Sequence, residues 1–127
     1  MPNPIVHFEI PADNVERAKT FYSKAFGWNL SSMPGMDYHM VETTSVGKDR
    51  RPTERGEING GLLKRSDPVK QVVITISVDN IDASLKTVAK NGGKAVGKKV
   101  QVGEMGWAAY FNDPEGNLIG LWQNSQK

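Results

Sequence analysis

The chain has 127 residues, 38% of them hydrophobic and 24% charged, with a formal net charge of +2. This length can bury one sizeable core, and no apolar run approaches the ~18 residues that a membrane helix needs. The absence of cysteine excludes disulfides, zinc–thiolate sites and cysteine nucleophiles, so any metal would need histidine, carboxylate or amide ligands.

We expect a cytoplasmic protein that binds neither a membrane nor nucleic acid. The N-terminus lacks the basic and then apolar layout of a secretory signal. The one basic cluster, residues 48–55, has no aromatic side chains that could stack on bases. This cluster is typical of a solvated surface loop.

Strand and helix patterns alternate through the first half of the chain. Period-two alternation predicts a strand over Ile5–Ile10 that ends at Pro11. Apolar residues at helical spacing then predict a helix from Val15 to Phe26, with Asp13 as its cap and Gly27 as its stop. Three further strands are expected at Trp28–Met33, Asp37–Thr44 and Ile58–Lys64.

The second half repeats this order of elements. A strand is predicted over Gln71–Val78, followed by a helix that Asp79 caps and Asn91-Gly92-Gly93 ends. The last strands are expected at Ala95–Val102, Trp107–Asn112 and Asn117–Gln123.

An internal repeat explains this symmetry. Asp13-Asn14 aligns with Asp79-Asn80 at an offset of 79 − 13 = 66 residues, and Gly60 aligns with Gly120 at an offset of 60. The sequence therefore predicts a single α+β domain, residues 1–127, built from two tandem βαβββ units at 1–66 and 67–127. We expect the two units to form an open mixed β-barrel that encloses a cavity, with the helices outside.

His7 and Glu9 are the main polar candidates for a site. They are two residues apart on a strand and so share one face, whereas the second unit has Val73 and Thr75 at these positions. An inward carboxylate is costly to bury unless it is paired or hydrated, so Glu9 favours a polar cavity. For His7, a general base, a ligand-binding group and a structural hydrogen-bonded histidine all remain open.

Aromatic and small residues are candidates for the walls of the cavity. Small-molecule pockets commonly combine apolar walls with a few polar groups, although packing inside the barrel is the alternative for each residue. The expected ligand-binding residues are His7, Glu9, Trp28, Met40, Gly60, Thr75, Trp107, Gly120 and Trp122.

Several motifs, together with the repeat, resemble the vicinal oxygen chelate superfamily, which includes glyoxalase I, extradiol dioxygenases and bleomycin resistance proteins. These motifs are Phe21-Tyr22, Gly27-Trp28, Ser77-Val78-Asp79-Asn80 and Asp113-Pro114-Glu115-Gly116. The resemblance covers almost the whole chain and implies the fold more strongly than the activity.

The same resemblance implies where metal ligands would lie. Carried over by position, they fall on His7, on Val73, at or beside Gly60, and on Gly120, so one ligand of four is kept. A divalent metal needs about three protein ligands. We therefore expect no metal or other cofactor, with a relocated site of His7, Glu9 and His39 as the alternative.

These observations predict a protein that binds a small organic molecule in an aromatic cavity, in the manner of the bleomycin resistance proteins. The alternative is a glyoxalase-type lyase or dioxygenase-like enzyme that uses a relocated metal or His7 and Glu9 as acid and base. A regulatory module is a third possibility, for which the sequence offers no exposed apolar segment. The resemblance also implies a homodimer.

Overall fold

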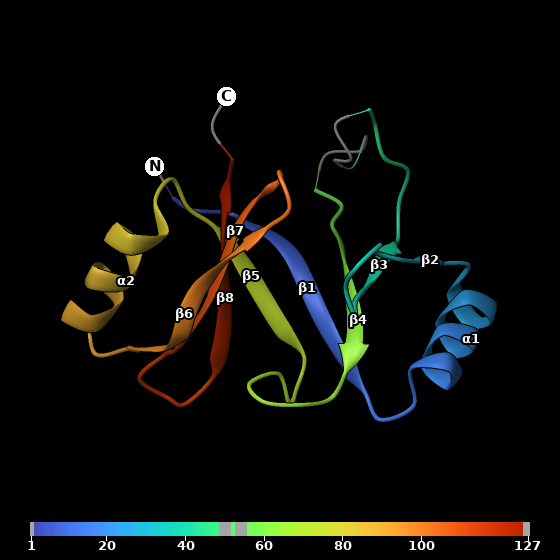
Figure 1. Ribbon diagram of the computed structural model, residues 1–127, viewed down its shortest axis with the longest axis horizontal. Coiled ribbons are helices and arrows are strands. Elements are labelled where there is room, and N and C mark those ends of the chain that lie inside the picture. The colour runs from blue at the N-terminus through green and yellow to red at the C-terminus, as the bar shows by residue number, and fades with distance from the viewer. Residues whose placement is uncertain (1, 49–51, 53–55, 126–127) are drawn as a thin grey trace. The chain divides into compact units, whose positions relative to one another are not determined.

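The computed structural model describes residues 2–48, 52 and 56–125, and most of the charged segment 48–55 lies outside the described residues. The described part contains two helices and eight strands, which confirms the predicted α+β class. The chain divides into two compact units, residues 7–72 and residues 1–6 with 73–127 (Figure 1). Across the described residues, no helix is both long and apolar enough to span a membrane.

The unit of residues 7–72 is a four-stranded sheet with one helix. In chain order it contains β1 (Ile5–Ala12) from His7 onward, α1 (Val15–Phe26), β2 (Asn29–Ser32), β3 (His39–Glu42) and β4 (Asn59–Lys64). The strands lie side by side in the order β2-β3-β4-β1, with β4 parallel to β1 and antiparallel to β3. This unit has the predicted βαβββ order.

Two details of this unit differ from the prediction. β1 does not stop at Pro11 but continues to Ala12, whose carbonyl accepts from the backbone N–H of Arg65 at 2.9 Å. The cap of α1 is Asn14, which has extended backbone angles and accepts from Arg17 N at 3.0 Å. Asp13 forms an ion pair with Arg65 instead.

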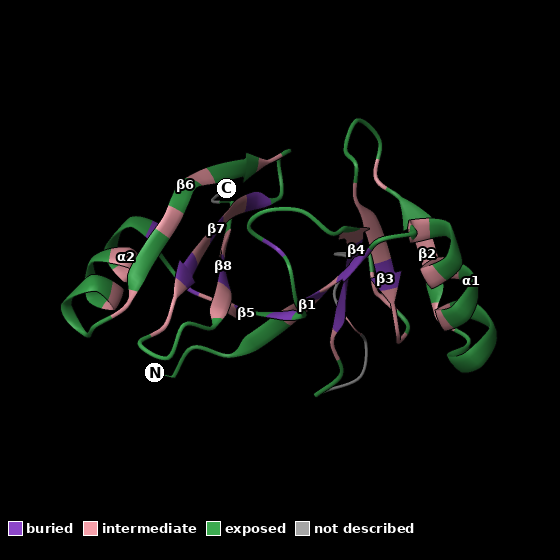
Figure 2. Ribbon diagram, turned by 90° about the horizontal axis from the view of Figure 1, so that it is seen from below, coloured by how far each residue is buried: buried purple, intermediate pink, exposed green. Residues whose placement is uncertain are grey.

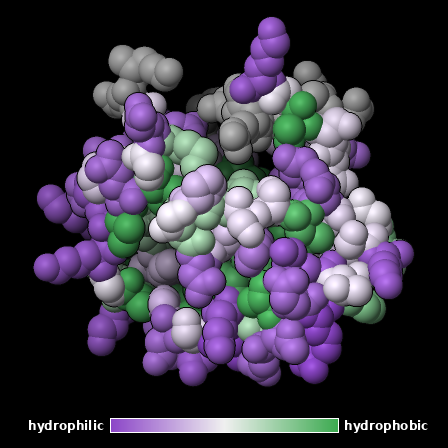
Figure 3. Space-filling model, turned by 45° about the vertical axis from the view of Figure 1, so that its right-hand side comes forward, coloured by the Kyte–Doolittle hydropathy of each residue, from purple (hydrophilic) through white to green (hydrophobic). Residues whose placement is uncertain are grey.

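The core of this unit lies between its sheet and α1. Its buried residues are Ala12, Val41 and Leu62, and Figure 2 shows the buried part of β4. Along α1, Val15 and Ala18 pack against this core, whereas Phe21 is 56% and Phe26 63% exposed. In the view of Figure 3, apolar side chains form separate patches among hydrophilic ones.

The other unit repeats the plan. It contains β5 (Val73–Ser77), α2 (Ile81–Lys90), β6 (Lys94–Val102), β7 (Gly106–Asn112) and β8 (Leu118–Asn124). Its strands lie in the order β5-β8-β7-β6, with β5 parallel to β8. The N-terminal residues join this unit because Ser77 N donates to Pro4 O at 2.9 Å.

The cap of α2 repeats the shift seen in α1. Asn80, not Asp79, accepts from Ala83 N at 2.8 Å, while the helix ends at Asn91 as predicted. The two asparagine caps keep the offset of 66 (80 − 14) because both helices begin with the same extended residue before the first turn. The core under α2 consists of Val78, Ile81, Ala109, Phe111 and Leu121.

Candidate functional site

The two faces of the sheet in residues 7–72 carry different side chains. Pairing in register places Glu9 of β1 beside Gly61 of β4, and Gly61 beside Met40 of β3, so these three residues share one face. His7, two residues before Glu9, lies on that face as predicted. The core residue Leu62 lies on the other face, against which α1 packs.

A hydrogen-bonded chain joins three side chains on the face of His7 and Glu9. Tyr38, the residue before β3, donates its O–H to Glu9 Oε2 at 2.8 Å. The hydroxyl oxygen of Tyr38 also lies 2.8 Å from His7 Nε2. Glu9 is only 8% exposed, and a buried carboxylate is destabilising without hydrogen-bond donors. Tyr38 supplies one of these donors.

Burial also changes the proton affinity of His7. Loss of hydration lowers the pKa of His7 from its usual value, because the imidazolium is harder to bury than the neutral ring. The negative charge of Glu9 opposes this effect and is the smaller of the two causes. His7 therefore favours the neutral imidazole.

Gly61 makes this arrangement sterically possible. A Cβ at residue 61 would lie 1.8 Å from Tyr38 Oη and 2.1 Å from Tyr38 Cζ, far inside van der Waals contact. The tyrosine ring thus occupies the space that any larger residue at position 61 would need. A Cβ at residue 60 would also lie too close to a neighbour, the Phe8 ring, but only the close approach at Gly61 belongs to this site.

Three residues of this face were missing from the predicted ligand-binding set: Tyr38, Gly61 and Asn59. Asn59 pairs in register with His7 and is 9% exposed. The Gly60-Gly61 pair was the available signal, but the choice between the two glycines depends on the register of β1 and β4. Tyr38 lies in the predicted strand Asp37–Thr44, two residues before Met40, so alternation from Met40 was an available signal for it, although β3 itself begins at His39.

The predicted residues Gly60 and Trp28 lie on the helix-facing side. Gly60 pairs with Phe8, and a Cβ at residue 60 would lie 2.5 Å from the Phe8 ring. Trp28 packs on the same core, with its ring stacked on Tyr22 at 4.8 Å and 6°. Neither residue is on the face of His7, whereas Met40 is.

Trp107 packs under α2 in the other unit. It contacts the core of that unit, and Lys99 Nζ lies 4.7 Å from the centre of its ring. Trp107 therefore packs against the core of its unit, which is the alternative to a cavity wall that the sequence left open.

Thr75, Gly120 and Trp122 are grouped by the pairing of β5 with β8. Thr75 pairs in register with Gly120, and a Cβ at residue 120 would lie 2.8 Å from Thr75 Oγ1. Trp122 follows Gly120 by two residues and shares its face, and its Nε1–H donates to Asn124 at 2.7 Å. This close contact repeats, in a milder form, the contact between Gly61 and Tyr38.

The residues at the positions that hold a metal in the superfamily do not form a suitable donor set. Val73 is apolar and 1% exposed, and Tyr38 fills the space beside Gly61. His7 Nε2 is already hydrogen-bonded to Tyr38. His39 lies on the opposite face, where it contacts Ser32 Oγ at 3.3 Å. No group of three or more histidine and acidic side chains converges within the described residues.

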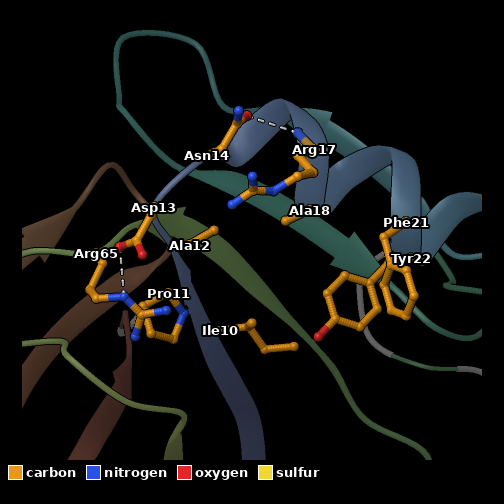
Figure 4. Close-up of a pocket in the computed structure, with 10 residues that line it drawn as sticks. All are labelled: Ile10, Pro11, Ala12, Asp13, Asn14, Arg17, Ala18, Phe21, Tyr22 and Arg65. Carbon is orange, nitrogen blue, oxygen red and sulfur yellow. Dashed lines mark hydrogen bonds and ion pairs between the residues drawn. The ribbon is translucent and has the colours of Figure 1, made fainter.

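A separate hollow of about 380 Å³ lies between the end of β1 and the start of α1 (Figure 4). Its walls include Ile10, Ala18 and Phe21, and the ion pair of Asp13 with Arg65 lies at its edge. It lies on the α1 side of the sheet, whereas His7 and Glu9 lie on the other side.

Comparisons with known proteins agree with this architecture. A family model described as bleomycin resistance protein-like N-terminal matches residues 4–44. A glyoxylase-like domain-containing protein from Didymella fabae is 32% identical over 118 residues, which cover 89% of this chain and 88% of that protein.

Solved structures show the same fold at low sequence identity. A methylmalonyl-CoA epimerase variant from Streptomyces coelicolor, in complex with 2-nitronate-propionyl-CoA, superposes with a TM-score of 0.67 at 14% identity, covering 98% of this chain and 96% of that one. A glyoxalase/bleomycin resistance protein/dioxygenase superfamily member from Vibrio splendidus gives 0.59 at 15% identity, covering 97% and 99%. The chain belongs to this superfamily, the vicinal oxygen chelate proteins, as its repeat and motifs indicated.

Proposed function

We propose that this protein binds a small organic molecule on the sheet face that carries His7, Tyr38 and Glu9, without a bound metal. The observation that carries the proposal is the hydrogen-bonded chain of these three side chains. A buried carboxylate joined to a half-buried phenol and imidazole is an unusual set for a face that only fills a core, because desolvation of each polar group is unfavourable. A binding surface for a partly polar ligand gives these groups a role.

Two further observations support this proposal. Met40 adds a flexible apolar surface beside the polar chain, and small-molecule sites commonly combine such surfaces with a few fixed polar groups. The epimerase neighbour contains a bound small organic ligand, a CoA ester, in the same fold. The implied homodimer remains part of the proposal and is carried by the superfamily resemblance.

Metal analysis and a ligand screen test the proposal together. The purified protein is analysed for bound metal and titrated with Ni²⁺, Zn²⁺ and Fe²⁺ while its tryptophan fluorescence is recorded. Small aromatic and amphipathic molecules are then screened by NMR of the ¹⁵N-labelled protein. We expect no stoichiometric metal, and ligands that shift the ring signals of His7.

Tyr38→Phe is the informative variant for this screen and Tyr22→Phe its control. The Tyr38 change removes the hydroxyl between His7 and Glu9, whereas Tyr22 lies on the opposite side of the sheet against Trp28. Ligand affinity should fall only in Tyr38→Phe. One tightly bound metal per chain would overturn the proposal, as would ligands that bind without any effect on His7.

Proton transfer is a second candidate function, and the lowered pKa of His7 favours it. A neutral imidazole at pH 7 can accept a proton from a carbon next to a carbonyl group, provided that the substrate is held within hydrogen-bond reach. Exchange of such protons for solvent deuterium, followed by ¹H NMR on the bound carbonyl compounds, tests this activity. Exchange that persists in His7→Gln would exclude His7 as the base.

A further inference from the structure

The hydroxyl of Tyr38 determines which nitrogen of His7 carries a proton. A phenol has a single proton, and Tyr38 donates it to Glu9 Oε2. The Tyr38 oxygen must therefore accept from His7, so that Nε2 of the neutral imidazole carries the hydrogen. The lone pair of the ring is then at Nδ1, which has no hydrogen-bond partner among residues 2–48, 52 and 56–125.

Asn59 provides a second unused group on the same face. Its Oδ1 accepts from the backbone N–H groups of Thr43 at 2.7 Å and Thr44 at 3.1 Å, which fixes the orientation of the amide. Its Nδ2 is fully buried and has no partner within the described part of the chain. A buried donor without a partner costs roughly 1–3 kcal/mol, so a ligand that pairs with it gains affinity.

The strand register brings these two groups together. His7 and Asn59 are in-register partners of the parallel β1–β4 pair, so their side chains leave neighbouring backbones on one face. The next position on that face of β4 is Gly61, which adds no side chain of its own. The register therefore places these two residues side by side, and each has one polar atom without a hydrogen-bond partner in the described part of the chain.

We propose that His7 and Asn59 recognise a carboxamide group of the ligand. This proposal assigns a ligand class to the site of the proposed function and rests on that function. The amide oxygen accepts from Asn59 Nδ2, and the amide N–H donates to His7 Nδ1. A carboxylate has no proton to donate at neutral pH and is repelled by Glu9, and a ketone has only the acceptor. The neutral amide alone among these groups satisfies both partners.

Three matched probes test this recognition: benzamide, N,N-dimethylbenzamide and benzoate. The unmodified ¹⁵N-labelled protein is titrated with each probe, while NMR follows the side-chain NH₂ of Asn59 and the ring nitrogens of His7. We expect the free protein to show the Nε2–H tautomer of His7. Benzamide should shift both residues and bind about tenfold more tightly than the other two probes, the ratio expected for a hydrogen bond lost from a buried pair.

Asn59→Asp provides the matched variant. It keeps an oxygen for the N–H groups of Thr43 and Thr44 but replaces the unpaired donor with an acceptor. Benzamide and N,N-dimethylbenzamide should both bind about tenfold more weakly to this variant, because the carbonyl oxygen that they share loses its donor. Unchanged affinities for both probes would overturn the role of Asn59. Its circular dichroism spectrum checks that it is folded, and the tautomer measurement on the unmodified protein does not depend on it.

Failure of this inference differs from failure of the proposed function. An Nδ1–H tautomer, or equal binding of benzamide and N,N-dimethylbenzamide at His7, overturns amide recognition and leaves small-molecule binding intact. If none of the probes or screened molecules affects His7, Tyr38 or Asn59, both proposals are wrong.

Discussion

Tyr38 lies where a side chain at residue 61 would have to be, since a Cβ on Gly61 would lie 1.8 Å from Tyr38 Oη. The glycine on β4 and the tyrosine before β3 therefore depend on each other. Through this space the tyrosine reaches both Glu9 and His7. One glycine thus determines whether the polar chain of this face can form.

Gly61→Ala should displace Tyr38 and break both of its hydrogen bonds on this face. Glu9 then loses a donor while still buried, so we expect the free energy of unfolding to fall by about 2–4 kcal/mol. Urea denaturation followed by tryptophan fluorescence measures this change.

A Tyr38→Ala background provides the control for this prediction. With the ring removed, the three atoms nearest to the added methyl group at residue 61 are gone, and we expect Gly61→Ala to cost less than about 0.5 kcal/mol. Additive losses in the double variant would show that the alanine is harmful for a reason unrelated to Tyr38.

Tyr38→Phe should separate the contribution of the Tyr38 hydroxyl to stability from the contribution of its ring. Packing against the backbone of Gly61 is kept, but Glu9 and His7 lose their common partner, which we expect to cost about 1–3 kcal/mol of unfolding free energy. The measurement is again urea denaturation, together with NMR of the His7 ring nitrogens.

Tyr22→Phe is the comparison on the other side of the same sheet. The Tyr22 ring stacks on Trp28, and none of the hydrogen bonds found in the described residues involves its hydroxyl, so the loss should stay within about 0.5 kcal/mol. Equal losses in the two variants would indicate that the Tyr38 hydroxyl contributes nothing specific.

Local patterns in the sequence predicted the elements and the shared face of His7 and Glu9. Alternation along β1 was sufficient for this, because it depends only on the backbone of one strand. The repeat was also predicted, although each helix cap lies one residue later than expected, at Asn14 and Asn80.

Relations between strands could not be predicted in the same way. The alignment of Gly60 with Gly120 uses an offset of 60, but the ladders pair Glu9 with Gly61 and Thr75 with Gly120. The equivalent glycines are thus 120 − 61 = 59 residues apart. Register arises from the hydrogen-bonding of two strands, and a slip of one residue exchanges the faces.

His7 should make stability depend on pH. Its pKa in the folded protein is below the usual value of about 6.5 that it has in the unfolded chain. At a pH between these two values the unfolded chain binds more protons, so the free energy of unfolding falls as the pH drops below about 6.5. This stability is fully present above pH 6.5. Urea denaturation at closely spaced pH values from 7.5 to 5.5 measures the decrease.

His7→Gln should flatten the pH profile in this range, since glutamine keeps an N–H donor for Tyr38 but does not titrate. His39→Gln, on the opposite face, serves as the control and should retain the decrease attributed to His7. An unchanged slope in His7→Gln would assign the pH dependence to other groups.

Gly120→Ala should destabilise the other unit by a smaller amount than Gly61→Ala destabilises its own. The added Cβ would lie 2.8 Å from Thr75 Oγ1 but 3.5 Å from Thr75 Cβ, so the clash involves mainly a single side-chain atom. We expect a loss of about 1–2 kcal/mol in the free energy of unfolding, because a buried side chain must shift in a close-packed interior.

Thr75→Ala removes the conflicting oxygen and leaves only ordinary contact, so the alanine at residue 120 should cost less than about 0.5 kcal/mol in that background. If the loss persists there, the requirement for glycine at residue 120 comes from a neighbour other than Thr75.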